Sequence, residues 1–277
     1  MRIGIHNFIT DDGIRPAAFG KALEERGFDS LFLGEHSHIP ASRESPFPAG
    51  GELPREYFRA VDPFVALGAV AAVTSNLRLG TGIALLIQRD VIYTANEVAS
   101  LDLVSNGRVD FGVGVGWNRE EMRNHGTDPK TRGALLDEKL EALKEIWTAD
   151  EAEYHGTYVD FDPIFTWPKP VQHPYPPIYV GGGGPAALAR VARHSATWLP
   201  NAAWDVDGAR AQIAQRDEHV GEARRMLVTT ADPNNLEVLD VYAEAGVERL
   251  TLMGTPAPEA DTLRELDQLA KILERYR

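Results

Sequence analysis

Two spacings of apolar residues alternate along the chain. Short runs of consecutive apolar residues are typical of buried strands in a parallel sheet, and stretches with an apolar residue every three or four positions are typical of amphipathic helices. Strands are predicted at residues 2–6, 30–35, 78–86, 109–115, 177–180, 196–199, 226–230 and 248–253. Helices are predicted at residues 16–26, 63–74, 90–103, 131–149, 186–194, 206–223, 236–245 and 260–276. Each predicted strand is therefore followed by a predicted helix along the whole chain.

This alternation sets the fold class. Strand–helix units in series favour parallel strands joined by right-handed crossovers, and eight such units are the number that closes a barrel. We expect an α/β protein that forms a single (β/α)8 TIM-barrel domain over residues 1–277, with an open, doubly wound sheet as the alternative. Two segments are too long to be plain connections, namely 37–59 after the second strand and 152–176 before the fifth. In such a barrel the functional side chains lie at the C-terminal ends of the strands.

Composition and charge indicate which classes of binding partner and which cellular compartment to expect. The chain has 28 Lys and Arg against 41 Asp and Glu, a formal net charge of −13, which argues against nucleic acid or an anionic membrane as the main partner. It contains no cysteine, which excludes disulfides, thiolate metal sites and cysteine nucleophiles. No apolar run approaches the roughly 18 residues of a membrane helix, and Met1 leads directly into the first strand without a signal-like segment. We expect a cytoplasmic protein that acts on a small-molecule substrate.

Four consecutive glycines, Gly181, Gly182, Gly183 and Gly184, end the fifth predicted strand and are followed by Pro185 at the start of a helix. Glycines allow a ligand to approach the backbone closely, and proline suits the first helical position because no N–H donor is needed there. A helix N-terminus with free amide groups is a ready site for an anion, above all a phosphate. A tight turn without a ligand is the alternative interpretation. The loop is not a Walker motif, because no Gly-Lys-Ser or Gly-Lys-Thr follows it.

A histidine pair follows the second predicted strand, in the run Glu35, His36, Ser37 and His38. A histidine at the mouth of a barrel suits general acid–base chemistry, so His36 is our candidate catalytic residue. The His-x-His spacing also resembles the metal-binding motif of amidohydrolase barrels. Those barrels need further ligands on later strands, and the eighth predicted strand contains no aspartate. We therefore expect no metal, and we interpret His38 as a solvated loop residue.

The segment from Gly114 to Glu121 closes the fourth predicted strand and enters a helix. Gly116, Trp117 and Asn118 are candidate cofactor contacts, because glycines at a strand end let a flat ring lie close to the backbone and the tryptophan could form one wall of a pocket. In the alternative interpretation the glycines taper the barrel interior and Asn118 caps the helix. The two interpretations are compatible with each other.

Several of these segments together resemble the bacterial luciferase-like flavin and deazaflavin oxidoreductases. The resemblance is carried by residues 79–83, 97–108, 111–121, 154–161, 177–183 and 246–249. Two of these segments read EVASLDLVSNGR and FGVGVGWNREE. The resemblance covers nearly the whole chain in order, and the sequence closely resembles the actinobacterial subgroup of this family that is thought to use coenzyme F420, a 5-deazaflavin.

The resemblance implies a (β/α)8 barrel that holds an isoalloxazine-type ring at its C-terminal mouth. It implies a cis peptide bond between Gly82 and Ile83 that bulges against this ring, so both residues are candidate cofactor contacts. It also places the cofactor's phosphate at Gly181–Gly184 and His36 near the reactive carbon. Related dehydrogenases have an acidic residue where this chain has Trp117, which leaves the proton donor unassigned. Family members commonly dimerise through their second and third helices, so we expect a homodimer.

Four functions are compatible with these observations. The first is hydride transfer between coenzyme F420 and a small organic substrate, because a deazaflavin carries carbon in place of the flavin N5 and moves two electrons as a hydride. The second keeps the fold but binds FMN and activates oxygen as a monooxygenase. The third is a barrel that holds a flavin without catalysis, and the fourth is a metal-dependent hydrolase. The polyglutamate tail of F420 would favour basic residues near the mouth, for which Arg119, Arg123 and Lys169 are candidates.

Overall fold

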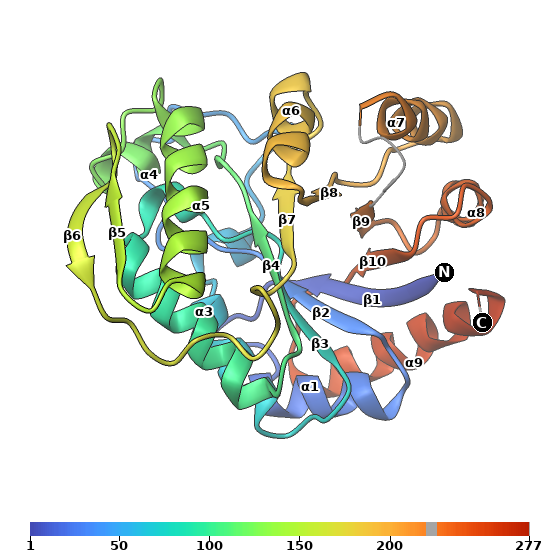
Figure 1. The fold of residues 1–277 in the computed structure, drawn as a ribbon. Helices are drawn as coiled ribbons and strands as arrows, with labels where there is room; N and C mark the ends of the chain where they lie inside the picture. The colour runs from blue at the N-terminus through green and yellow to red at the C-terminus, as the bar shows by residue number, and fades with distance from the viewer. Residues whose placement is uncertain (220–225, 277) are drawn as a thin grey trace.

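The computed structural model describes residues 1–219 and 226–276, and within them eight parallel strands form the centre of the molecule (Figure 1). These strands are β1 (Arg2–Asn7), β2 (Ser30–Leu33), β3 (Arg78–Thr81), β4 (Val109–Val113), β7 (Ile178–Gly181), β8 (Thr197–Leu199), β9 (Leu227–Ala231) and β10 (Arg249–Met253). They pair in the order β8-β7-β4-β3-β2-β1-β10-β9. Isolated parallel bridges between Trp198 and Met226 and between Asn201 and Thr229 join the two end strands, so the sheet closes. The predicted (β/α)8 barrel is confirmed.

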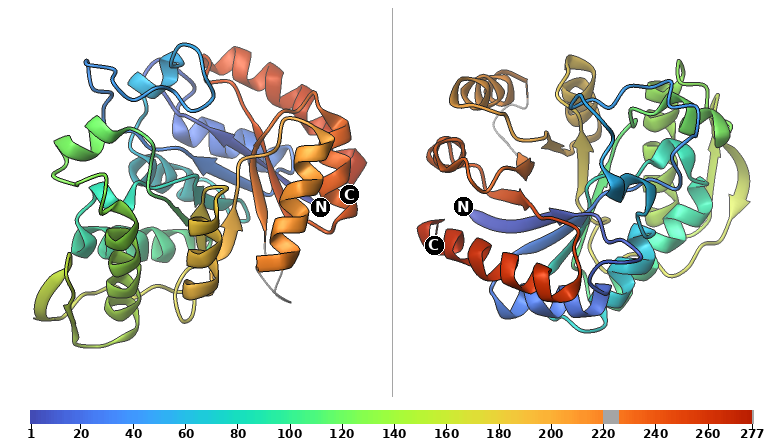
Figure 2. Two further views of the ribbon diagram at one scale, coloured as in Figure 1. Left: turned by 90° about the horizontal axis from the view of Figure 1, so that it is seen from above. Right: turned by 180° about the vertical axis from the view of Figure 1, so that it is seen from behind.

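The helices lie on the outside of the barrel (Figures 1 and 2). They are α1 (Pro16–Glu25), α2 (Pro63–Ala71), α3 (Val91–Ser105), α4 (Arg119–Asn124), α5 (Arg132–Thr148), α6 (Pro185–His194), α7 (Val206–His219), α8 (Leu236–Glu244) and α9 (Glu259–Tyr276), with the short 3-10 helices η1 (Arg55–Phe58) and η2 (Leu86–Gln88). Pro16, Pro63 and Pro185 begin three of these helices, because a first helical residue needs no N–H donor. The first and last elements meet, since the Met1 amino group donates to the Tyr276 carbonyl at 3.3 Å.

Two long segments interrupt the strand–helix alternation, as predicted. The first, residues 34–62, contains η1 and leads from β2 to α2. The second lies between α5 and β7 and forms an antiparallel hairpin of β5 (Ala152–His155) and β6 (Asp160–Ile164) beside α5. The Glu138 carboxylate on α5 accepts the backbone N–H groups of Tyr158 at 2.6 Å and Val159 at 3.1 Å. These bonds hold the hairpin turn against the helix.

The end of β3 differs from the prediction. The strand ends at Thr81, whereas the apolar pattern predicted it to residue 86, because the cis peptide bond after Gly82 interrupts regular pairing, Ala84 keeps only an isolated bridge to Val113, and η2 follows. Glu35, at the end of β2, holds the departing segment in place. Its carboxylate accepts the backbone N–H of Leu85 at 2.6 Å and the Nε of Arg89 at 2.7 Å. The prediction failed here because an apolar run does not show where regular strand pairing ends.

Two further boundaries also differ. β4 ends at Val113 rather than at residue 115, and the chain bends away from an extended path at Gly116, which takes a φ of 63°. The described part of α7 ends at His219. The predicted extension of that helix to residue 223 lies outside the described residues.

A buried network of charges fills the end of the barrel that carries the N-termini of the strands. Asp110 on β4 is 1% exposed and accepts hydrogen bonds from Arg249 Nη1 at 2.9 Å and from Arg78 Nε at 2.8 Å. The Tyr179 hydroxyl on β7 donates to the same carboxylate at 3.3 Å. Burial and the neighbouring Asp110 charge raise the pKa of Tyr179. Because paired charges close this end, we expect a ligand at the opposite, C-terminal end.

Residues 97–108, which carry part of the family resemblance, have structural roles. Asp102 is 0% exposed and accepts the Gln172 backbone N–H at 2.9 Å and its side-chain Nε2 at 2.8 Å. The Arg108 guanidinium donates to two carbonyls at the C-terminal end of α2, at 3.0 and 2.9 Å. Asn106 ends α3 with a left-handed φ of 57°. This segment therefore fastens α2 and α3 to the barrel.

Candidate active site

A buried hydrogen bond between a histidine and a carboxylate lies just beyond the C-terminal end of β2. His36 is 8% exposed, and its Nδ1 lies 2.7 Å from Oε2 of Glu121, which is 0% exposed. The other oxygen of this carboxylate accepts the Ser37 backbone N–H at 3.2 Å. An ionised carboxylate only accepts, so this geometry assigns the hydrogen to Nδ1 of the imidazole. Nε2 has no hydrogen-bond partner in the part of the chain that the structure describes, and it is the nitrogen left for a ligand.

Glu121 reaches His36 because of the way α4 begins. Asn118 is the N-cap, and its Oδ1 accepts the Glu121 backbone N–H at 3.1 Å. Glu121 is thus the third residue of the helix, where the free N–H groups of the first turn favour a negative charge. The sequence analysis quoted this glutamate within a motif but gave it no role. The signal that could have found it is an acidic residue three positions after a capping asparagine at a strand end.

We expect Asn118→Ala to lower the free energy of unfolding by about 1 kcal/mol, because α4 loses its cap. Asn118→Ser differs from this variant by one hydroxyl oxygen that can still cap the helix, so we expect it to retain most of the stability. Urea denaturation measures both values against the natural protein. If the two variants lose the same amount, the side-chain oxygen does not cap α4.

Glu120 holds the long segment after β2 against the same helix. Its Oε1 accepts the Ser45 backbone N–H at 2.6 Å, and the Ser45 hydroxyl donates to its other oxygen. Burial alone would raise the pKa of Glu120, but hydrogen bonds from Ser45 and from neighbouring backbone N–H groups together lower it. The Arg119 backbone N–H in turn donates to Ser45 Oγ at 3.1 Å. Two consecutive glutamates therefore fix this segment, one at His36 and one at Ser45.

Aromatic rings surround the His36 imidazole. The centroids of Phe8, Tyr57 and Trp117 lie 6.5, 5.2 and 5.7 Å from it. Phe47 packs against both Tyr57 and Trp117. Burial raises the pKa of Tyr57 to about 12, so its hydroxyl is neutral at physiological pH. The structure places the predicted Trp117 beside His36, whereas the other three rings were missed because two of them come from the irregular segment after β2.

Gly82 and Ile83 follow β3 and are joined by a cis peptide bond. The His6 Nε2 on β1 lies 2.6 Å from the Gly82 carbonyl oxygen, and burial lowers the pKa of this histidine. A Cβ on Gly82 would lie 2.9 Å from the His6 ring. The Ile83 side chain packs directly against Gly114 and Gly181. A Cβ added to Gly114 would lie 2.2 Å from an Ile83 side-chain atom, and a Cβ added to Gly181 would lie 3.0 Å from one. Packing against Ile83 therefore requires both of those glycines and brings the ends of β3, β4 and β7 together.

Gly116 has a backbone role. Its φ of 63° lies in the left-handed region that favours glycine. A Cβ here would lie 3.0 Å from Leu85 and 3.4 Å from Met122. The position needs glycine for conformation and packing, and its contact with a cofactor ring stays a prediction.

The glycine loop after β7 has the features of an anion site. Gly182 adopts a φ of 114°, and its carbonyl accepts the Trp198 Nε1 hydrogen at 2.7 Å. A Cβ on Gly183 or Gly184 would meet no atom within 4 Å, so the space around them is open. Their backbone N–H groups have no acceptor among residues 1–219 and 226–276, and Gly184 is the N-cap of the ten-residue helix α6. The loop therefore fits a phosphate group.

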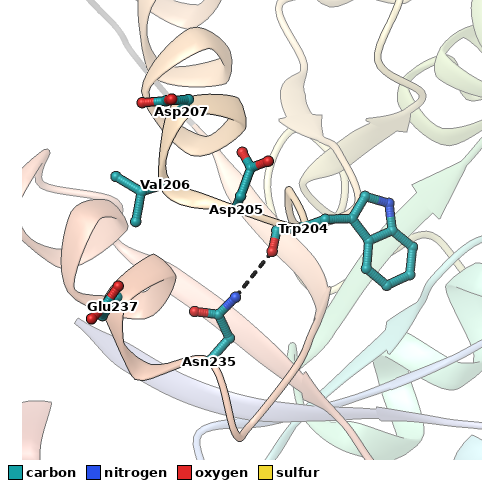
Figure 3. A pocket seen from close by; sticks show the side chains of 6 residues that line it. All are labelled: Trp204, Asp205, Val206, Asp207, Asn235 and Glu237. Carbon is teal, nitrogen blue, oxygen red and sulfur yellow. Dashed lines mark hydrogen bonds between the residues drawn. The ribbon is translucent and has the colours of Figure 1, made fainter.

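A cavity of about 340 Å³ lies between the N-termini of α7 and α8 (Figure 3). The carboxylates of Asp205, Asp207 and Glu237 are part of its lining. Asn235 Nδ2 donates to the Trp204 carbonyl at 3.0 Å, and the Trp204 indole points away from the other labelled side chains. Three carboxylates repel a phosphate, so this cavity is a poor cofactor site and the glycine loop remains the candidate.

Two of the basic residues proposed for a cofactor tail are engaged elsewhere. Lys169 Nζ donates to the carbonyls of Ile146 and Ala149, both at 2.6 Å, where α5 ends. The α5 C-terminus lies at the strand N-terminal end of the barrel, so the prediction for Lys169 is wrong. Arg123 forms an exposed pair with Glu44 at 3.4 Å.

The described residues hold no group of three or more His, Asp or Glu side chains placed to bind a metal ion. Among the helices of the same residues, none is both long and apolar enough to cross a membrane.

Comparison with known proteins identifies the family. The sequence model of the luciferase-like monooxygenases matches residues 15–232. An uncharacterised protein of Mycobacterium tuberculosis is 43% identical over 203 residues, 72% of each chain. The FMNH2-dependent dimethylsulfone monooxygenase of Pseudomonas putida is 34% identical over 122 residues, 43% of this chain and 33% of that protein. The coenzyme F420-dependent tetrahydromethanopterin reductase of Methanopyrus kandleri superposes over the full length of both chains with a TM-score of 0.75 and 16% identity. The chain belongs to the luciferase-like monooxygenase family.

Proposed function

We propose that this protein is an oxidoreductase that transfers a hydride between coenzyme F420 and a small organic substrate. The observation that carries the proposal is the buried pair of His36 and Glu121 at the barrel mouth. Hydride transfer to or from a polar group such as a carbonyl is accompanied by the movement of a proton. An imidazole oriented by a carboxylate is well placed to give or take that proton. The deazaflavin, when bound, supplies or accepts the hydride.

Each residue of the pair has a distinct role in this proposal. His36 exchanges the proton with the substrate through Nε2. Glu121 keeps the hydrogen on Nδ1 and stabilises the imidazole when it is charged. Trp117 and Tyr57, packed on the ring, keep water away from it, so that the proton moves between His36 and the substrate.

The glycine loop supports a phosphate-bearing cofactor. The N–H groups of Gly183 and Gly184 would bind the phosphate, and Ile83 and Gly116 would contact the ring. FMN also carries a phosphate, and a relative named as FMNH2-dependent favours FMN-dependent monooxygenation as the second candidate. We prefer F420 because an oriented proton donor and acceptor suits hydride transfer.

Anaerobic mixing of the protein with reduced F420 and a panel of aldehydes, ketones and activated alkenes tests the function. We expect reoxidation of the deazaflavin, followed by its visible absorbance, with at least one acceptor. The same mixture in air without an acceptor should react slowly. Oxygen-dependent consumption of reduced FMN, with no turnover of reduced F420, would contradict the proposal and support the monooxygenase.

We also propose a homodimer formed through α2 and α3. Val65 on α2 is 71% exposed, and Tyr93 and Val104 on α3 are 77% and 61% exposed. The two α3 residues lie about three turns apart and therefore share a face. The exposed Trp167 extends this apolar surface, since Asn96 Nδ2 on α3 donates to its carbonyl at 3.1 Å. Several large apolar side chains exposed on adjacent elements are typical of a protein interface.

Tyr93→Asp is expected to raise the dissociation constant of this dimer at least about 30-fold, because a charge replaces an aromatic side chain that the proposed interface would bury. Light scattering coupled to size exclusion measures the mass over a range of concentrations. Leu236→Asp, at a partly exposed apolar residue on α8, is the control and should leave the mass unchanged. A natural protein that is monomeric under the same conditions would contradict the dimer.

A further inference from the structure

A second cavity, of about 530 Å³, lies on the outside of the barrel between η2, the beginning of α5 and the hairpin turn. Its volume falls within the range of about 300–1,000 Å³ that is usual for small-molecule sites. Ile87, Leu135 and Tyr158 supply apolar surface, and Lys139 lies among them. Its lining does not include the residues placed at the candidate active site. The cavity is therefore separate from the proposed cofactor site.

Lys139 presents a positive charge to this cavity. Its Nζ donates to the carbonyl of Leu86 at 3.1 Å and to the carbonyl of Arg89, which leaves the third N–H without a partner among the described residues. Those residues provide no carboxylate in an ion pair with it. Burial lowers the pKa of Lys139 to about 8. The nearby Asp90 charge partly offsets this lowering of the pKa but forms no ion pair with the ammonium, so the remaining N–H of this half-buried group favours the binding of an anion.

The other titratable groups that line the cavity are engaged or are not cations. Asp90 and Asp128 each accept a backbone N–H of their own turn, at 2.8 and 2.9 Å. The Arg89 guanidinium is shared by three carboxylates. His125 Nε2 forms a hydrogen bond of 2.7 Å with a serine hydroxyl, and Tyr158 faces the cavity from the hairpin turn. Lys139 is therefore the group best placed to bind a ligand's charge.

We propose that this cavity binds a small organic acid, with its carboxylate on Lys139 and its apolar body against Ile87, Leu135 and Tyr158. A single negative charge suits the cavity better than a phosphate dianion, because two aspartates also line it. The proposal does not depend on the identity of the cofactor. It predicts a second small-molecule site in addition to the one at the barrel mouth.

Calorimetric titration of the full-length protein with benzoate at pH 8 tests the proposal, in two buffers of different ionisation enthalpy. Benzoate is expected to bind at millimolar concentration or below. Its charge raises the pKa of Lys139 from about 8, so the complex should take up about half a proton per site. Lys139→Arg keeps the cation but holds its proton throughout, so it should bind benzoate without proton uptake.

Two variants and one ligand serve as controls. Lys139→Met should weaken benzoate binding at least about tenfold, whereas Lys130→Met, at an exposed lysine between α4 and α5, should leave it unchanged. Benzamide has the same shape without the charge and should bind at least about tenfold more weakly than benzoate. The proposal is overturned by absence of binding, by unchanged binding in Lys139→Met, or by proton uptake that persists in Lys139→Arg. If Lys139→Met does not fold, the difference in proton uptake between the natural protein and Lys139→Arg tests the proposal without it.

Discussion

Replacing Glu121 by glutamine is expected to lower kcat by about 10²–10⁴-fold and to leave the dissociation constant of the cofactor within about threefold. The carboxylate accepts from His36 Nδ1 at 2.7 Å in a fully buried position. An amide at the same place can donate to Nδ1, which moves the ring hydrogen to Nε2 and removes the charge that stabilises a protonated imidazole. The loss should therefore appear in the chemical step.

Two measurements separate this positioning role from a general loss of structure. Nitrogen NMR of labelled histidine, with the His36 signal assigned through His36→Gln, should show the hydrogen on Nδ1 in the natural protein and on Nε2 in Glu121→Gln. Glu120→Gln is the matched control, because it disturbs the bonds to Ser45 on the same helix without touching His36. We expect it to reduce kcat by less than about fivefold. Equal losses in the two glutamine variants would refute the role of Glu121.

Gly183→Asp is expected to weaken cofactor binding by about 100-fold, or about 2.7 kcal/mol. The residue lies in the open glycine loop, directly before the N-cap of α6. A carboxylate at this position would repel the cofactor's phosphate and compete for the same N–H groups. The folded protein should tolerate it, because an added Cβ meets no atom within 4 Å.

Gly183→Ala is the control for this change. It adds the same Cβ without the charge, so we expect the dissociation constant to stay within about threefold. Quenching of cofactor fluorescence measures binding, and thermal unfolding of both apo-proteins checks the fold. Unimpaired binding in Gly183→Asp would exclude the glycine loop as the phosphate site.

Most of the fold could be predicted because strands and helices here have clear apolar periods. Prolines and short glycine-containing turns predicted where helices begin and end, as at Pro16 and Pro63, which begin α1 and α2. The end of β3 could not be predicted, because Ala84, Leu85 and Leu86 remain buried after the chain has left the strand. An apolar residue indicates that its side chain is buried, but it does not indicate which structural element buries it. The assignment of residues 1–277 to one domain stays a prediction.

The candidate site could be predicted only in part. His36 and the glycine loop follow strand ends, and the barrel rule places strand ends at the mouth. The partner of His36 could not be identified because it lies 85 residues away in sequence. The rings of Phe47 and Tyr57 come from an irregular segment whose path depends on the buried bonds of Glu120 and Glu121. Hydrogen bonds between distant residues leave no periodic pattern in the sequence from which they could be predicted.

The measurement that tests the central claim most directly is a titration of the purified apo-protein with coenzyme F420 and, separately, with FMN, followed by cofactor fluorescence. We expect F420 to bind with micromolar or tighter affinity and FMN to bind more weakly. Preferential binding of FMN would contradict deazaflavin-dependent hydride transfer and would support an oxygen-activating enzyme. Binding of neither cofactor would contradict the proposed function as a whole, including the phosphate role of Gly181–Gly184.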